Sequence, residues 1–185
     1  MTILVLGPSK WRKGYSPVVP VWVAERVPAG WPIRRSGLPE PLAIRAAVAR
    51  DLEERESASA TFMEGHERLP GEKNITKLNR IVRDLEVDRY VLFWPYGAQR
   101  PGLDVEIGSL LQRMDQGEEL DITMFVEAGA KVAGRVEDGL FVSREATRRT
   151  HYYEDLLEFG ASFVEWDTYE TLWFSLMNYG RRSIR

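Results

Sequence analysis

The chain has 185 residues, of which 44% are hydrophobic, and it carries a formal net charge of -3. This length suits one domain spanning residues 1–185, and the apolar share is enough for a sizeable core. The acidic balance argues against general binding to nucleic acids or anionic membranes. The chain has no cysteine and only two histidines, which excludes disulfides and thiolate sites and leaves little for a zinc centre, so we expect no bound metal.

The chain opens with an apolar run over residues 2–6, which predicts a central strand that ends at Gly7 and Pro8. No basic leader precedes this run, and no stretch approaches membrane-spanning length. We therefore expect a soluble, cytoplasmic protein. Neither a GxGxxG nor a GxxxxGK[ST] motif occurs, so we also expect no dinucleotide or other cofactor.

A long connection covers residues 9–39 and contains five prolines and three tryptophans, Trp11, Trp22 and Trp31. Residues 18–23 are compatible with an edge strand, and the tryptophans favour an ordered flap that closes over a site as a lid.

Basic residues gather just beyond the first strand and recur further along this connection. They are Lys10, Arg12, Lys13, Arg34 and Arg35. Their position at the carboxyl end of a strand is compatible with a phosphate site, and a solvated surface is the alternative.

Strands and helices alternate along the rest of the chain. The expected helices cover residues 41–54, 74–85, 102–116, 144–159 and a C-terminal segment capped by Asp167 and Glu170, and the expected strands cover residues 58–63, 90–94, 120–126 and 161–165. Asn74 is expected to cap its helix, and Asp138-Gly139 predicts a small hairpin within residues 131–143. This alternation predicts an α/β fold: a five-stranded, mainly parallel, flavodoxin-like or Rossmann-like sheet with order 2-1-3-4-5 and helices on both faces.

The strand at residues 90–94 leads into a helix that carries the strongest candidate for catalysis. Ile107, Leu110 and Met114 fall on one apolar stripe, which leaves Glu106 off that stripe. With Asp104 as the cap, Glu106 would lie in the first turn and stay ionised. A carboxylate at the carboxyl end of a parallel sheet suits a nucleophile or a base, and ordinary compensation of the helix dipole is the alternative.

Two short motifs resemble the nucleoside 2-deoxyribosyltransferase family. The first strand ends in Leu6-Gly7-Pro8 with an aromatic residue at Trp11, and residues 88–108 contain Asp88 and the sequence Val105-Glu106-Ile107-Gly108. The resemblance implies that Glu106 attacks the anomeric carbon and displaces the base. Nucleotide N-glycosidases and TIR domains that hydrolyse NAD use a glutamate in a comparable place. Where the family usually carries two aspartates, this chain has Trp94-Pro95-Tyr96 and Arg100.

This resemblance implies cleavage or transfer of an N-glycosidic bond on a small-molecule nucleoside or nucleotide. Glu106 and Tyr96 are the catalytic candidates, because the Tyr96 hydroxyl could bind the carboxylate or the sugar. Trp11 or Trp94 could stack on a base, and Arg100 with Lys10 or Arg12 could hold a phosphate. The full set of substrate-binding candidates is Gly7, Pro8, Lys10, Trp11, Arg12, Trp94, Arg100 and Asp104.

Two other functions remain open from the sequence. One is a non-catalytic module of the same fold that senses a nucleotide. The other is an interaction protein, or a homo-oligomer, that uses the C-terminal helix. That helix has a bulky stripe, Tyr169, Leu172, Trp173 and Leu176, which is typical of a core or a dimer contact.

Overall fold

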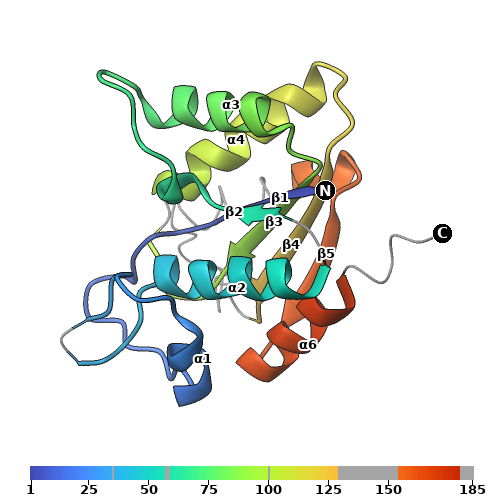
Figure 1. Ribbon diagram of the computed structural model, residues 1–185. Coiled ribbons are helices and arrows are strands. Elements are labelled where there is room, and N and C mark those ends of the chain that lie inside the picture. Colours follow the sequence, from blue (N-terminus) through green and yellow to red (C-terminus); the bar gives the residue numbers. More distant parts are fainter. Residues whose placement is uncertain (35, 57–58, 100, 129–153, 180–185) are drawn as a thin grey trace, which may run out of the picture.

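A computed structural model of the chain describes residues 1–34, 36–56, 59–99, 101–128 and 154–179 (Figure 1). Five parallel strands form one sheet in the order β2-β1-β3-β4-β5. They are β1 (Thr2–Leu6), β2 (Ser59–Thr61), β3 (Arg89–Trp94), β4 (Asp121–Glu127) and β5 (Ser162–Trp166). The predicted flavodoxin-like order 2-1-3-4-5 is therefore confirmed.

Helices cover both faces of this sheet (Figure 1). One face carries α1 (Val21–Arg26), α2 (Pro41–Glu56) and α6 (Tyr169–Tyr179), and the other carries α3 (Asn74–Leu85) and α4 (Pro101–Asp115). A short 3-10 helix, η1 (Met63–Gly65), follows β2. Residues along β1 and β3 alternate between two apolar clusters, so that Ile3, Val5, Val91 and Phe93 are buried under the first helix layer, as their pattern predicts.

The register brings the carboxyl ends of the strands to one edge of the sheet. Leu6 of β1 pairs with Leu92 of β3, and Trp94 at the end of β3 pairs with Val126 of β4. The segments that leave β1, β3 and β4 therefore start side by side, which is where ligands bind in open parallel sheets.

Three boundaries differ from the predictions. Residues 21–26 form the helix α1 and not an edge strand, because Pro20 precedes a turn that buries Val23 in the core beside α2 and α6. Lys73, and not Asn74, is the N-cap of α3. The helix α4 begins at Pro101, so Asp104 lies inside its first turn and Glu106 lies in the second.

The C-terminal elements agree with the pattern in the sequence. Residues 154–158 are helical, and Gly160, with a φ of 89°, ends this helix as predicted. All four residues of the predicted stripe on α6 are buried, which makes the stripe part of the core. The predicted cap differs in one respect: α6 is capped by Thr168, whose hydroxyl oxygen accepts a bond from the Thr171 N–H at 3.2 Å, and not by Asp167 with Glu170. Asp167 lies one residue before the cap and accepts a bond from the Thr171 hydroxyl at 2.9 Å.

The predicted hairpin within residues 131–143 and the first half of the helix predicted over residues 144–159 lie outside the described residues. Within the part of the chain that the structure describes, no helix has the length and apolar character needed to cross a membrane.

Candidate functional site

Glu106 lies at the carboxyl edge of the sheet, where its side chain reaches from α4 to the end of β1. The carboxyl group is buried, with only 2% of the residue exposed, and its Oε2 accepts a hydrogen bond from the Gly7 N–H at 3.1 Å. The helix after β1 and the helix after β3 leave on opposite faces of the sheet. Glu106 therefore lies at the topological switch point, the usual location of a ligand in this class of fold.

Gly7 connects Glu106 to a buried arginine. Its N–H donates to Glu106, and its carbonyl oxygen accepts a bond from Nη1 of Arg45 on α2 at 2.5 Å. The residue has a φ of 153°, and a Cβ atom there would come within 2.5 Å of the Phe93 carbonyl oxygen. Only glycine fits this point of contact between β1 and β3.

Arg45 forms a buried ion pair with Glu64. The guanidinium is fully buried and donates to both carboxylate oxygens of Glu64, at 3.1 and 3.0 Å, and to the Val5 carbonyl oxygen at 3.0 Å. The Ser9 hydroxyl also donates to Glu64 at 2.9 Å. Burial opposes ionisation of Glu64, but Arg45 and Ser9 outweigh it, so the pKa of Glu64 lies below its ordinary value.

The electrostatics of Glu106 differ from those of Glu64. Burial raises the pKa of Glu106 to about 8, and the nearby Glu64 carboxylate also raises this pKa, while Arg45 and the Gly7 N–H only partly offset them. Glu106 is therefore mostly protonated at neutral pH, and the expectation that it stays ionised is wrong. The expectation failed because the carboxyl group lies in a dry environment and one turn further from the helix N-terminus.

The two tryptophans predicted to stack on a base both lie in the core. Trp11 is 2% exposed, and its indole N–H donates to the Pro39 carbonyl oxygen at 2.8 Å. Trp94 is also 2% exposed, within the cluster under α3 and α4. A base could stack on either ring only if that ring left its packing.

The remaining substrate-binding candidates surround the same edge. Lys10 is exposed and Arg12 is half-buried. The backbone at these residues lies beside residues 97–99: the Arg12 N–H donates to the Gly97 carbonyl oxygen at 2.9 Å, and the Gln99 N–H donates to the Lys10 carbonyl oxygen at 2.8 Å. Pro8 is buried beside Gly7, and Asp104 is half-buried on α4. Arg100 lies outside the described residues.

Tyr96 is separated from the carboxylate that it is predicted to bind. In the described residues, the hydrogen bond that Glu106 accepts comes from Gly7, and Tyr96 makes none to it. The Tyr96 ring instead meets Tyr15 edge to face, with 5.7 Å between the ring centroids, and its N–H donates to Glu127. A contact between the Tyr96 hydroxyl and a sugar stays a prediction.

Two tryptophans of the connection over residues 9–39 pack on neighbouring elements. Trp22 packs edge to face on Trp173 of α6 at 5.1 Å, and Trp31 packs on Phe62 at 4.7 Å. The helix layer therefore holds Trp22 and the segment after β2 holds Trp31, and closure of the connection over Glu106 stays a prediction. Arg34 is likewise held inside the connection by Glu40, at 2.8 Å.

Arg45 and Glu64 were missed by the sequence analysis, although the sequence contains a signal for each. Arg45 lies three residues before Val48 and seven before Leu52, which puts a charge on the inner face of the predicted helix. Glu64 directly follows the predicted second strand, where a carboxyl-edge residue belongs.

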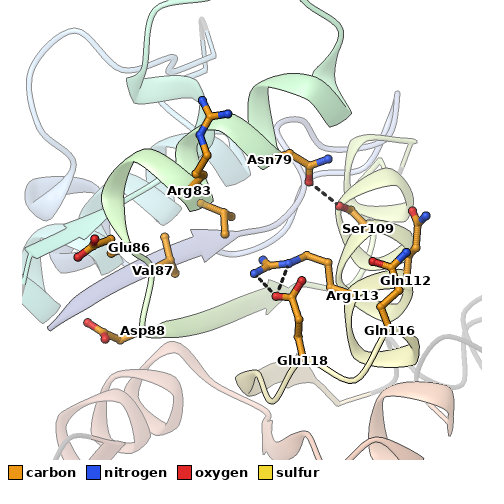
Figure 2. A pocket seen from close by; sticks show the side chains of 11 residues that line it. Asn79, Arg83, Glu86, Val87, Asp88, Ser109, Gln112, Arg113, Gln116 and Glu118 are labelled. Carbon is orange, nitrogen blue, oxygen red and sulfur yellow. Dashed lines mark hydrogen bonds and ion pairs between the residues drawn. The ribbon is translucent and has the colours of Figure 1, made fainter.

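Two cavities lie at the opposite, amino edge of the sheet, away from Glu106. The larger, of about 720 Å³, lies between α3 and α4 (Figure 2) and is lined by residues that include Val87, Asp88 and Gln112. Figure 2 shows the Ser109 hydroxyl bonded to Asn79 across the two helices and Arg113 paired with Glu118. The smaller, of about 450 Å³, is lined by residues that include Arg89, Asp121 and Ser162, the first residues of three strands.

The described side chains contain no group of three or more carboxylate, histidine or cysteine ligands arranged to hold a metal ion. Comparison with family models, curated proteins and solved structures finds no significant match for this chain. The arrangement around Glu106 is therefore interpreted from its own geometry.

Proposed function

We propose that this protein cleaves or transfers the N-glycosidic bond of a nucleoside or nucleotide, with Glu106 as the nucleophile. The observation that supports the proposal best is a buried glutamate at the topological switch point, held by the Gly7 N–H and flanked by the Arg45–Glu64 ion pair. The resemblance of the segments around Gly7 and Glu106 to the deoxyribosyltransferases supports the same assignment.

The proposed reaction uses the carboxylate against a positively charged transition state. A Glu106 oxygen forms a bond to the anomeric carbon as the carbon–nitrogen bond breaks, and the bonding pair leaves with the base, which takes up a proton from water. Water, or a second base, then attacks the same carbon and releases Glu106. A dry environment strengthens the attraction between the carboxylate and an oxocarbenium-like sugar.

The resting protonation state of Glu106 sets a condition on this reaction. With a pKa of about 8, only about a tenth of the carboxyl groups are ionised at pH 7. The nucleophile must lose this proton before it attacks, so the rate should rise with pH. The Arg45–Glu64 pair supports the reaction indirectly, because it fixes the carbonyl group of the same Gly7 whose N–H orients Glu106.

The charge near the site favours a phosphorylated substrate. Lys10 and Arg12 follow the end of β1, and the residue after Gln99 is Arg100. A charge-assisted contact to phosphate is worth roughly 1.5 to 3 kcal/mol, which corresponds to about one to two decades in preference. We therefore propose a nucleoside monophosphate as a better substrate than the bare nucleoside.

The test is a panel of nucleosides, nucleotides and NAD incubated with the protein, with free base measured by chromatography. Wild type should release base from at least one compound, and Glu106→Gln should not, because the amide keeps the shape of the side chain but cannot form the glycosyl ester. Glu119→Gln is the matched control, since Glu119 is exposed beyond the other end of α4. Equal base release by wild type and Glu106→Gln would overturn the proposal.

The burial of Glu106 favours one alternative, a non-catalytic nucleotide-sensing module. The residue is 2% exposed, and neither of the two described cavities reaches it. In that case a nucleotide would raise the melting temperature of the protein while no base appears. The same panel therefore separates a sensor from an enzyme.

A further inference from the structure

A second carboxyl group lies at the carboxyl edge of the sheet, on β4. Glu127 is the last residue of that strand and is half-buried. Its Oε2 accepts a hydrogen bond from the Tyr96 N–H at 2.6 Å, and this is the one bond to its carboxyl group among the described residues. One oxygen of a partly buried carboxyl group is thus left for a further hydrogen-bond donor.

Tyrosines from three separate segments surround Glu127. Tyr15 comes from the connection after β1, Tyr96 follows β3, and Tyr169 begins α6. The Tyr15 and Tyr96 rings meet edge to face at 5.7 Å, and Glu127 lies near enough to Tyr15 and Tyr169 to raise the pKa of both, after the larger effect of burial. Gly97 holds this arrangement, because any Cβ there would come within 2.5 Å of the Tyr15 ring.

Glu127 has no cationic partner in the part of the chain that the structure describes. Burial raises the pKa of Glu127 and the Tyr96 N–H lowers it, with no contribution from a lysine or arginine among the described residues. Among the described residues, the Tyr15 and Tyr96 hydroxyl groups make no hydrogen bond either. An unpaired carboxyl oxygen beside unengaged phenol groups and an exposed aromatic ring suits a polyol, whose hydroxyl groups donate while its carbon face packs on the ring.

We propose that Glu127, together with the hydroxyl groups of Tyr15 and Tyr96, binds the vicinal hydroxyl groups of a pentose. This inference rests on the proposed function, since it assigns the sugar subsite of the same reaction. It commits the substrate to a ribonucleoside or ribonucleotide and disfavours the deoxy sugar, because the 2′- and 3′-hydroxyl groups together supply the donors that Glu127 accepts.

The two carboxyl groups lie at the same edge of the sheet. Glu106 bonds to Gly7 at the end of β1, and Glu127 ends β4, two strands away across β3. In the proposed complex the anomeric carbon of the sugar faces Glu106, and the hydroxyl groups of the same sugar face Glu127.

The test measures binding separately from turnover. Calorimetry with adenosine, guanosine, cytidine and uridine, each paired with its 2′,3′-dideoxy counterpart, is run on wild type, Glu127→Gln and Tyr15→Phe. Glu165→Gln, an exposed glutamate on the neighbouring strand β5, is the matched control. Glu127→Gln keeps an acceptor for the Tyr96 N–H, so the fold of this edge should survive.

Wild type should bind at least one ribonucleoside more tightly than its dideoxy counterpart. Glu127→Gln should weaken ribonucleoside binding about 10- to 100-fold, and Tyr15→Phe by about 5-fold, with less than about twofold change for the dideoxy compound and for Glu165→Gln. No binding of any ribonucleoside, or equal losses for both members of a pair, would overturn the sugar assignment. Ribose-dependent binding without base release would contradict the proposed reaction alone.

Discussion

Glu106 should make the folded protein less stable as the pH rises. The unfolded carboxyl group ionises near pH 4.5 and the folded one near pH 8, so the cost is absent below pH 4.5, grows between these values and is complete above pH 8. Glu106→Gln removes the ionisation and should stabilise the protein by on the order of 3 kcal/mol more at pH 8 than at pH 5. Urea unfolding of wild type and Glu106→Gln at both pH values measures this difference in the free energy of unfolding. An equal difference at the two pH values would show that the Glu106 carboxyl group is not excluded from water.

Gly7 should tolerate no side chain. Gly7→Ala would bring a Cβ within 2.5 Å of the Phe93 carbonyl oxygen and would move the N–H away from Glu106, so we expect a loss on the order of 3 kcal/mol. Gly14→Ala is the matched control, because Gly14 also has a positive φ, 80°, but has no atom near its Cβ position. The free energy of unfolding of the control should fall by only about 1 kcal/mol. Similar unfolding midpoints for the two variants would contradict the close contact at Gly7.

At the scale of elements, Arg45 connects α2 to the end of β1 and to η1 through one guanidinium. Arg45→Met should cost on the order of 3 kcal/mol, because it leaves Glu64 and two carbonyl oxygens without their donor. Adding Glu64→Gln should recover part of that loss. Arg50→Met on the same helix is the control, and it should change the free energy of unfolding by less than about 0.5 kcal/mol, because the Arg50–Glu54 pair is exposed.

The same variant also tests the electrostatics of the site. Arg45 lowers the pKa of Glu106, so its removal should raise that pKa further and shift any dependence of activity or stability on Glu106 to higher pH. The pH at which the fall in stability of Arg45→Met levels off, compared with that of wild type and with Arg45→Met/Glu106→Gln as the reference without this ionisation, measures the shift. An unchanged pH dependence would show that Arg45 does not act on Glu106.

At the scale of the whole molecule, the sheet could be predicted because buried parallel strands consist of continuous apolar runs, such as residues 2–6 and 90–94. The strand predicted at residues 18–23 was wrong. Valines and a tryptophan favour a strand locally, but packing of Val23 in the core stabilises a helix instead. The position of Glu106 followed from the topology, which orders the strand ends along one edge.

The chemistry of the site was less predictable than its location. The role of Arg45 could not be predicted, because the sequence of its helix does not indicate that Glu64, from a distant turn, forms an ion pair with it. The protonation state of Glu106 was missed because desolvation depends on the final packing and not on the local sequence. Trp11 and Trp94 were predicted to bind substrate, but they pack in the core, because their burial also depends on the final packing.

The pH dependence of base release tests the central claim most directly. For wild type, kcat/KM on a compound that the panel identifies should rise about tenfold per pH unit from pH 5 and level off near pH 8, because the attacking form of Glu106 is the ionised one. Glu106→Gln should show no release at any pH. A rate that falls as the pH rises toward 8, or residual release with the wild-type pH profile in Glu106→Gln, would contradict the assignment of Glu106 as the nucleophile.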